Sequence, residues 1–207
     1  MMMNKEILKF DFEVRAKRDE QHGTYLEGTP IVYDAWTDLG WYDEQIQRGA
    51  LDNTDLTDVR FLINHNTDMI PLARSRNNNA NSTMQLEVVE GQGLDIRVNL
   101  DTENNADAKA LYSAVERNDI DKMSFMFIVE SDKWDDVDSE HPTRTITGIR
   151  RVLEVSAVTW PAYSATSIQA RGLSDALESA KASLESVKAA KRELELAKAK
   201  LKMKARI

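Results

Sequence analysis

Apolar and polar residues alternate at the start of the chain, where Leu8, Phe10, Phe12 and Val14 are separated by single charged residues. This alternation is typical of a β-strand with one buried face, so we expect a strand over residues 7–16. Later apolar or alternating segments are bounded by residues that favour turns, which indicates a series of short strands. We expect these strands at 25–33, 59–63, 86–89, 94–100, 123–129, 143–149 and 152–158, loops at 36–41, 77–82 and 131–142, and a short helix at 46–51.

One segment among these strands has helical spacing. Ala108, Leu111 and Val115 lie three or four residues apart, and the polar residues of 102–105 can cap a helix that runs to about Arg117. Seven or more strands, mostly joined by hairpins and with this helix inserted among them, predict a closed or nearly closed antiparallel β-barrel.

The pattern changes after Gly172. Residues 173–207 contain no glycine or proline and are rich in Ala, Glu, Lys and Leu, which favour a helix. Their apolar residues form one heptad seam, which Lys191 and Lys198 interrupt. The seam consists of Leu177, Ala180, Leu184, Val187, Leu194 and Leu201. We therefore expect a body at 1–172 and a helical tail that is either a solvated helix or one that binds a partner, a second copy included.

Charge divides the chain at the same place. Residues 173–207 hold nine basic and five acidic residues, a net charge of +4, which leaves −12 for residues 1–172 out of the chain's −8. An acidic body repels phosphates, so we expect it to bind no nucleic acid. No apolar segment approaches the about 20 residues of a membrane helix, and the N-terminus lacks the apolar core of a signal peptide. We expect no membrane partner.

The composition also limits the chemistry. The chain has no cysteine, which excludes disulfides, cysteine nucleophiles and thiolate metal ligands. Its three histidines, His22, His65 and His141, are too scattered along the sequence to indicate a zinc site. We therefore expect neither a metal nor a cofactor.

Three polar residues interrupt segments predicted as buried strands. Ser124 lies within the apolar 123–127, His65 closes the strand at 59–63, and Glu154 lies within another predicted strand. Each alone is more typical of a structural role: a hydroxyl bonded to a neighbouring backbone, a satisfied histidine, or a glutamate paired with a nearby arginine. Together, a serine, a histidine and an acid have the composition of a serine hydrolase site.

The chemistry explains why these residue types are needed together. A serine hydroxyl is a weak nucleophile, so an imidazole must accept its proton and later pass it to the leaving amine. A carboxylate on the other ring nitrogen fixes the tautomer and stabilises the imidazolium. The oxyanion needs preorganised donors, for which Arg150 and Arg151 are candidates, with a salt bridge to Glu154 as their alternative role.

Six segments of the chain match, in order, the motifs of one known family. They lie at 28–33, 44–51, 59–66 with 71–74, 93–94, 122–127, and 153–158 with 161–163. In this order they resemble the tailed-phage prohead (capsid maturation) serine protease family over about residues 7–170. Each segment is unspecific alone, and their shared order makes the resemblance specific. Met126 departs from the pattern, since many members have glycine there.

The resemblance implies a mainly β fold with helices, similar to the β-barrel of the herpesvirus assemblins, plus the C-terminal helix. It implies an endopeptidase inside the immature phage prohead in the host cytoplasm, which cleaves the major capsid protein, the scaffold segment and itself. By position, Ser124 would be the nucleophile and His65 the base. Glu154 would be the third member, and His141 is the alternative because assemblins use a second histidine after the serine.

The resemblance also gives the basic helix at 173–207 a role. We expect it to tether the protease to scaffold or capsid protein and then to be removed by self-cleavage. The competing interpretation is a catalytically inert capsid assembly or scaffolding protein on the same fold. An unrelated β-barrel binding module with an oligomerisation helix is a third, and it would place His65 far from Ser124.

Overall fold

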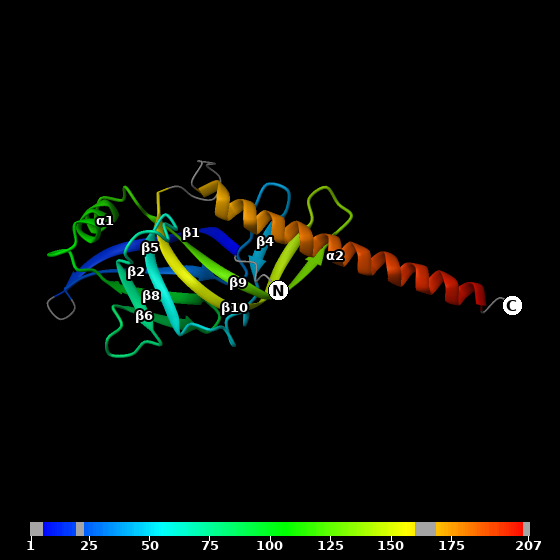
Figure 1. The fold of residues 1–207 in the computed structure, drawn as a ribbon, viewed down its shortest axis with the longest axis horizontal. Helices are drawn as coiled ribbons and strands as arrows, with labels where there is room; N and C mark the ends of the chain where they lie inside the picture. Colours follow the sequence, from blue (N-terminus) through cyan, green and yellow to red (C-terminus); the bar gives the residue numbers. More distant parts are fainter. Residues whose placement is uncertain (1–5, 20–22, 160–168, 205–207) are drawn as a thin grey trace.

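The computed structural model describes residues 6–19, 23–159 and 169–204. These residues form ten strands, two helices and the loops between them. The strands are β1 (Glu6–Asp19), β2 (Gly23–Val32), β3 (Thr37–Asp38), β4 (Asp43–Ile46), β5 (Asp58–Ile63), β6 (Ala73–Arg76), β7 (Met84–Val89), β8 (Gly93–Asn99), β9 (Lys122–Asp135) and β10 (Thr143–Val158), and the helices are α1 (Ala106–Glu116) and α2 (Gln169–Lys204). Figure 1 shows a β-rich body along which α2 lies and beyond which it projects. His22 and the motif residues 161–163 lie outside the described ranges.

The main path of the sheet runs β3-β4-β10-β9-β1-β2-β8-β7, with β5 pairing to β10 and β6. The pairings are antiparallel except for two made by β10, which is antiparallel to β9 but parallel to β4 along its first part and to β5 along its last. The predicted closed barrel is not confirmed, because no ladder among the described strands joins β6 to β7. The body is mainly β, with an open sheet and a C-terminal helix.

The hydrophobic core lies on one face of this sheet. Alternate residues of the central strands are buried there, among them Val14, Leu26, Phe125 and Val155. Burial of each such side chain contributes about 1.5–3 kcal/mol. The residues between them point to the opposite, outward face of the sheet, and the candidate site lies on that face, where Ser124, Glu154 and Ser156 are nevertheless buried.

Helix α1 confirms the helix that the sequence predicts near Ala106. The side chain of Asn105 caps it by accepting hydrogen bonds from the backbone N–H groups of Asp107 at 3.0 Å and Ala108 at 3.2 Å. The buried side chains Ala108, Leu111 and Val115 then pack on the core, as their spacing indicates.

The short helix predicted at 46–51 is wrong. Ile46 ends β4, which pairs with β10, and a turn follows. Gly49 has φ of +88°, a left-handed conformation that glycine adopts readily and that a helix interior does not allow. The strand pairing and this turn therefore override the local helical pattern.

Strands β9 and β10 form a longer hairpin than the sequence predicts. The segments 143–149 and 152–158 are one strand, whose register against β9 shifts at four irregular positions. Such bulges bend a strand without ending it. Gly148 allows the close approach at one of them, because an added Cβ would lie 2.7 Å from Ser131 Oγ. Strand β9 continues to Asp135, so the loop predicted at 131–142 begins later than expected.

The first half of α2 packs against the body. Ala180 and Leu184 are buried in a second apolar cluster with Tyr42, Trp134 and Val137. Part of the predicted seam is therefore a packing face, and α2 begins at Gln169, before the expected boundary at 172. Whether 173–207 act as a separate unit stays a prediction.

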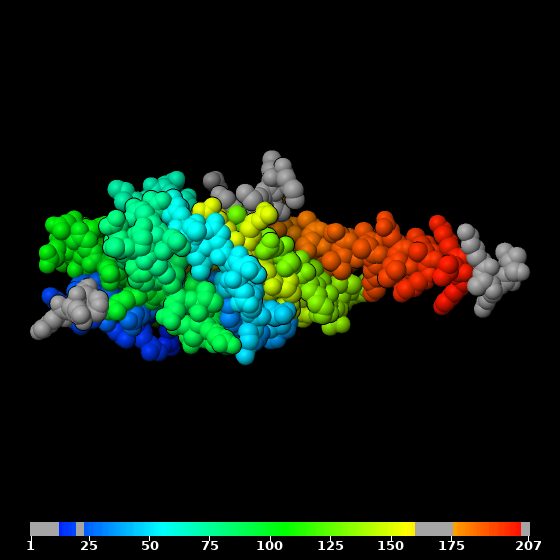
Figure 2. Space-filling view, turned by 90° about the horizontal axis from the view of Figure 1, so that it is seen from below, coloured from blue at the N-terminus to red at the C-terminus, as the bar shows by residue number. Residues whose placement is uncertain are grey.

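The second half of α2 projects from the body, as the orange and red end of the chain shows in Figure 2. The exposed fraction along the seam rises from 37% at Val187 to 55% at Leu194 and 72% at Leu201. Lys191 makes a 2.5 Å ion pair to Asp138 of the body, the last one along α2 among the described residues. Neither α1 nor α2, as far as each is described, has a stretch long and apolar enough to cross a membrane.

Candidate active site

Strand β10 brings the three predicted site residues together, because it lies between β9 and β5. Ser124 on β9 is the register partner of Ser156 on β10, and Glu154 lies two residues earlier on β10. On its other edge, β10 pairs with β5, and His65 follows β5 by two residues. Residues two apart in a strand share a face, so Glu154 and Ser156 both face outward, away from the core residue Val155.

The three side chains form a continuous chain of hydrogen bonds. His65 Nε2 lies 2.8 Å from Ser124 Oγ, and His65 Nδ1 lies 2.6 Å from Glu154 Oε1. A carboxylate accepts only, so Nδ1 carries a hydrogen, and in the neutral imidazole the lone pair of Nε2 then faces the serine hydroxyl. Ser124 is fully buried, and the side chains of His65 and Glu154 are 7% and 3% exposed. This arrangement can move a proton from the serine to the imidazole.

A left-handed turn directs His65 back over β10. Asn64 and His65 have φ of 53° and 56°, a conformation that asparagine and histidine adopt more readily than most residues. The backbone N–H of Asn64 donates to the carbonyl of Ala157 at 2.9 Å. The side-chain oxygen of Asn64 accepts hydrogen bonds from the N–H of Thr159 at 2.9 Å and from its hydroxyl at 3.0 Å. The end of β10 therefore holds the turn in place.

Two contacts at the site were missed by sequence reasoning. Ser156 Oγ accepts a hydrogen bond from the N–H of His65 and donates one to Glu154 Oε2. The side chain of Asn64 holds the histidine turn, as described above. The available signals were the spacing of Glu154 and Ser156, which places both on one face, and the asparagine before the histidine, which favours a left-handed turn.

The alternative third member, His141, lies at the opposite end of β10 from Glu154. It precedes the first residue of β10, and its Nε2 lies 3.2 Å from Asp43 Oδ1. With Asp38 these two residues form a cluster whose potential metal-ligand atoms all lie within 4.8 Å of one another. The cluster is largely exposed, and exposed acidic groups of this kind are common without a bound ion. The structure thus brings Glu154, and not His141, to His65.

The strand register places the two arginines considered for the oxyanion away from Ser124. Arg151 is the register partner of Ile128, four residues from Ser124 along β9, which corresponds to roughly 13 Å. Its Nε lies 3.4 Å from Asp55 Oδ2. Arg150 precedes it on the strand and is exposed. Both arginines thus lie three and four residues before Glu154 on β10, and a role for them at the oxyanion stays a prediction.

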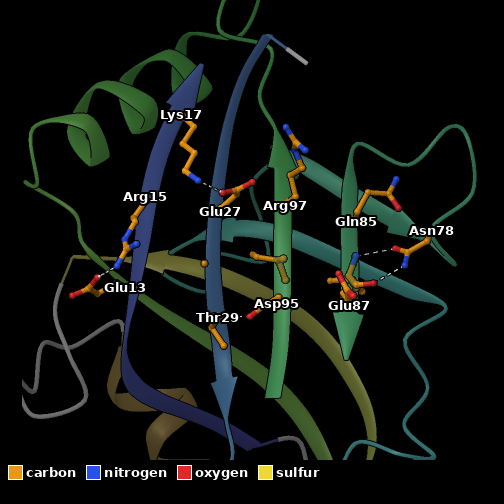
Figure 3. Close-up of a pocket in the computed structure, with 13 residues that line it drawn as sticks. Glu13, Arg15, Lys17, Glu27, Thr29, Asn78, Gln85, Glu87, Asp95 and Arg97 are labelled. Carbon is orange, nitrogen blue, oxygen red and sulfur yellow. Dashed lines mark hydrogen bonds and ion pairs between the residues drawn. The ribbon is translucent and has the colours of Figure 1, made fainter. Parts of the chain in front are cut away.

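A broad polar groove shares the outward face with Ser124. Glu13 on β1 is the register partner of Lys122, two residues before Ser124. From there the groove crosses β1, β2, β8 and β7 with a volume of about 980 Å³. Figure 3 shows two pairs of charged side chains in this groove that point toward one another, Glu13 with Arg15 and Lys17 with Glu27. The hydrogen bond from Arg15 lowers the pKa of Glu13, and the one to Glu27 raises the pKa of Lys17.

A serine that is hydrogen-bonded to a histidine, which is in turn hydrogen-bonded to a carboxylate, is the arrangement found in serine hydrolases. The chain belongs to the caudovirus prohead serine protease family, whose model matches residues 10–181. The match spans nearly all of the β body and the start of α2, up to residue 181, and it confirms the resemblance that the sequence motifs indicate. No curated protein and no solved structure matches the chain. Membership supports a role as a capsid maturation protease in the phage prohead.

Proposed function

We propose that the chain is a serine endopeptidase of phage prohead maturation in which Ser124 is the nucleophile, His65 the general base and Glu154 the acid that orients it. One observation carries this assignment: the hydrogen-bond chain from Ser124 Oγ through both ring nitrogens of His65 to Glu154, with distances of 2.8 and 2.6 Å. Family membership supports the same class of reaction.

The geometry supports a two-stage hydrolysis. Ser124 Oγ attacks the carbonyl carbon of the scissile peptide bond while its proton passes to His65 Nε2. His65 then gives this proton to the leaving amine, and an acyl-enzyme remains. In the second stage, His65 takes a proton from water, which attacks the carbonyl carbon of the acyl group. The new carboxylic acid leaves, and the proton returns to Ser124 Oγ to regenerate the free hydroxyl. Glu154 stabilises the imidazolium in both stages, and its burial strengthens that interaction relative to water.

The proposed substrates are the major capsid protein with its scaffold segment, and the chain itself. Peptide hydrolysis inside a prohead requires that the protease be held there during assembly. The projecting half of α2 suits that task, because Leu194, Leu196, Leu201 and Met203 are all more than half exposed and lysines lie between them. Such a basic amphipathic helix can bind an acidic helix of the scaffold or capsid protein, and self-cleavage can then remove it.

The direct test compares intact masses. The wild type, Ser124→Ala and Ser75→Ala are each co-expressed with the major capsid protein and its scaffold segment. Ser75 is the matched control, because it is also a fully buried strand serine but lies on β6. We expect wild type and Ser75→Ala to shorten the capsid protein and Ser124→Ala to leave it whole. Intact capsid protein beside the wild type would instead support the inert scaffolding protein.

A further inference from the structure

The hydroxyl of Ser156 lies between two parts of the candidate site. It is fully buried on β10, directly opposite Ser124 on β9. Its Oγ lies 3.0 Å from the backbone nitrogen of His65 and 2.5 Å from Glu154 Oε2. It therefore contacts two of the three proposed catalytic residues without lying between the atoms that react.

The directions of both hydrogen bonds follow from the groups involved. The backbone N–H of His65 can only donate, so Ser156 Oγ accepts from it. The hydroxyl has a single hydrogen, and the neighbouring carboxylate oxygen of Glu154 accepts it. Glu154 then accepts from Ser156 at Oε2 and from the His65 ring at Oε1. Both oxygens of the buried carboxylate are engaged, which fixes the plane of the carboxylate.

The same hydroxyl fixes the position of the imidazole. His65 has a left-handed backbone conformation, which is unfavourable for a residue with a Cβ and persists only where contacts hold it. The hydrogen bond from the His65 N–H to Ser156 is one such contact. A single side chain thus sets the distance between the base and its carboxylate from both sides.

We propose that Ser156 is a positioning residue of the catalytic site, which orients Glu154 through its hydroxyl hydrogen and anchors the backbone of His65 through its oxygen. The inference rests on the proposed function, because it assigns Ser156 a part in activating Ser124. Its structural part, the orientation of the His65–Glu154 pair, can be measured without any catalysis.

The test uses three variants of Ser156. Ser156→Ala removes the hydroxyl, Ser156→Cys keeps the size but offers only a weak donor, and Ser156→Thr keeps the hydroxyl on a residue that suits a strand. The control is Ser75→Ala, which removes a buried hydroxyl hydrogen-bonded to Asn78 at 3.0 Å, away from the site. If Ser156→Ala did not fold, the isosteric Ser156→Cys would carry the comparison.

The first readout is covalent labelling of Ser124 by a small fluorophosphonate, followed by intact mass over time. We expect the maximal labelling rate of Ser156→Ala and Ser156→Cys to fall by roughly ten- to a hundredfold, the loss typical when a hydrogen-bond partner that orients a metal-ligating residue is removed, which is a comparable orienting role. The probe concentration at half-maximal rate should stay unchanged. Ser156→Thr and Ser75→Ala should label like the wild type.

The second readout is the proton resonance of His65 Nδ1–H in full-length chain with labelled histidine. The chain has only three histidines, and a His65→Ala variant assigns the signal. We expect this resonance to move in Ser156→Ala and Ser156→Cys and to stay in Ser156→Thr and Ser75→Ala. An unchanged resonance with wild-type labelling in Ser156→Ala would overturn the inference. A wild type that the probe does not label would contradict the proposed function alone, and the resonance would still decide the role of Ser156.

Discussion

At the scale of single residues, the site depends on a backbone conformation as much as on its side chains. Asn64 and His65 are both left-handed, a conformation that costs about 1–2 kcal/mol for each residue with a Cβ. Asparagine lowers this cost through local hydrogen bonds, and here its side chain also accepts from Thr159. The turn therefore combines a tolerant residue with contacts that hold it.

Asn64→Ala should reveal this cost. The variant loses two hydrogen bonds to Thr159 and keeps an unfavourable backbone, so we expect the free energy of unfolding to fall by about 1–3 kcal/mol. Asn64→Asp keeps the acceptor oxygen and should lie close to the wild type. Urea unfolding measures both variants. Asn66→Ala is the control, because the backbone of Asn66 is not left-handed. A change below about 0.5 kcal/mol in Asn64→Ala would contradict the proposed role of the turn.

The sequence indicated three of the four residues that the candidate site brings together, and it missed the fourth for one reason. Ser124, His65 and Glu154 are conspicuous because each interrupts an apolar segment. Ser156 interrupts the same segment as Glu154, but its role depends on the parallel pairing of β5 with β10. That pairing joins residues about 90 positions apart, and no local pattern reports it.

At the scale of elements, short and polar strands escaped prediction. Strand β6 consists of Ala73–Arg76, and β3 has only two residues, so neither shows an alternating apolar pattern. Helix α1 was predictable because its cap and its apolar spacing agree. The positions of β9 and β10 were predictable, but their lengths were not. Bulges shift the register between them and disturb the alternation of apolar and polar residues.

The packing of α2 against the body can be tested with two leucines of the same seam. Leu184 is 6% exposed and Leu194 is 55% exposed. Leu184→Ala removes a buried side chain, so the contact between helix and body should weaken by about 2 kcal/mol. Hydrogen exchange of the amides near residues 179–187 should then be roughly 30-fold faster, whereas Leu194→Ala should leave it unchanged. Equal exchange in both variants would contradict docking through this face.

At the scale of the whole molecule, α2 is divided between two environments. Its first half completes the body over Tyr42 and Trp134, and its second half extends into solvent. The sequence correctly indicated one apolar face along this helix. It could not indicate that only the first part of that face is buried, because the aromatic residues that cover it, Trp134 and Tyr42, lie about 50 and 140 residues earlier in the chain.

This division allows a truncation that separates tethering from folding. A chain that ends at Ser186 keeps Ala180 and Leu184 and removes the exposed half. We expect the truncated chain to unfold close to the wild-type midpoint, to retain fluorophosphonate labelling of Ser124, and to be packaged into proheads at a much lower copy number. Normal packaging of this variant, quantified against the capsid protein, would rule out the projecting helix as the tether.

The place of β10 between β9 and β5 also limits how the chain can change in length. Side chains alternate between the two faces of a strand, so one residue inserted between the bulges and Glu154 would shift the whole catalytic end by one step. Unless a further bulge absorbed the extra residue, Glu154 and Ser156 would then face the core. The loop at 136–142 lies beyond the last ladder pair and carries no such constraint. We therefore expect homologous chains to differ in length at that loop, and to show no insertion or deletion along the end of β10 that carries Glu154 and Ser156.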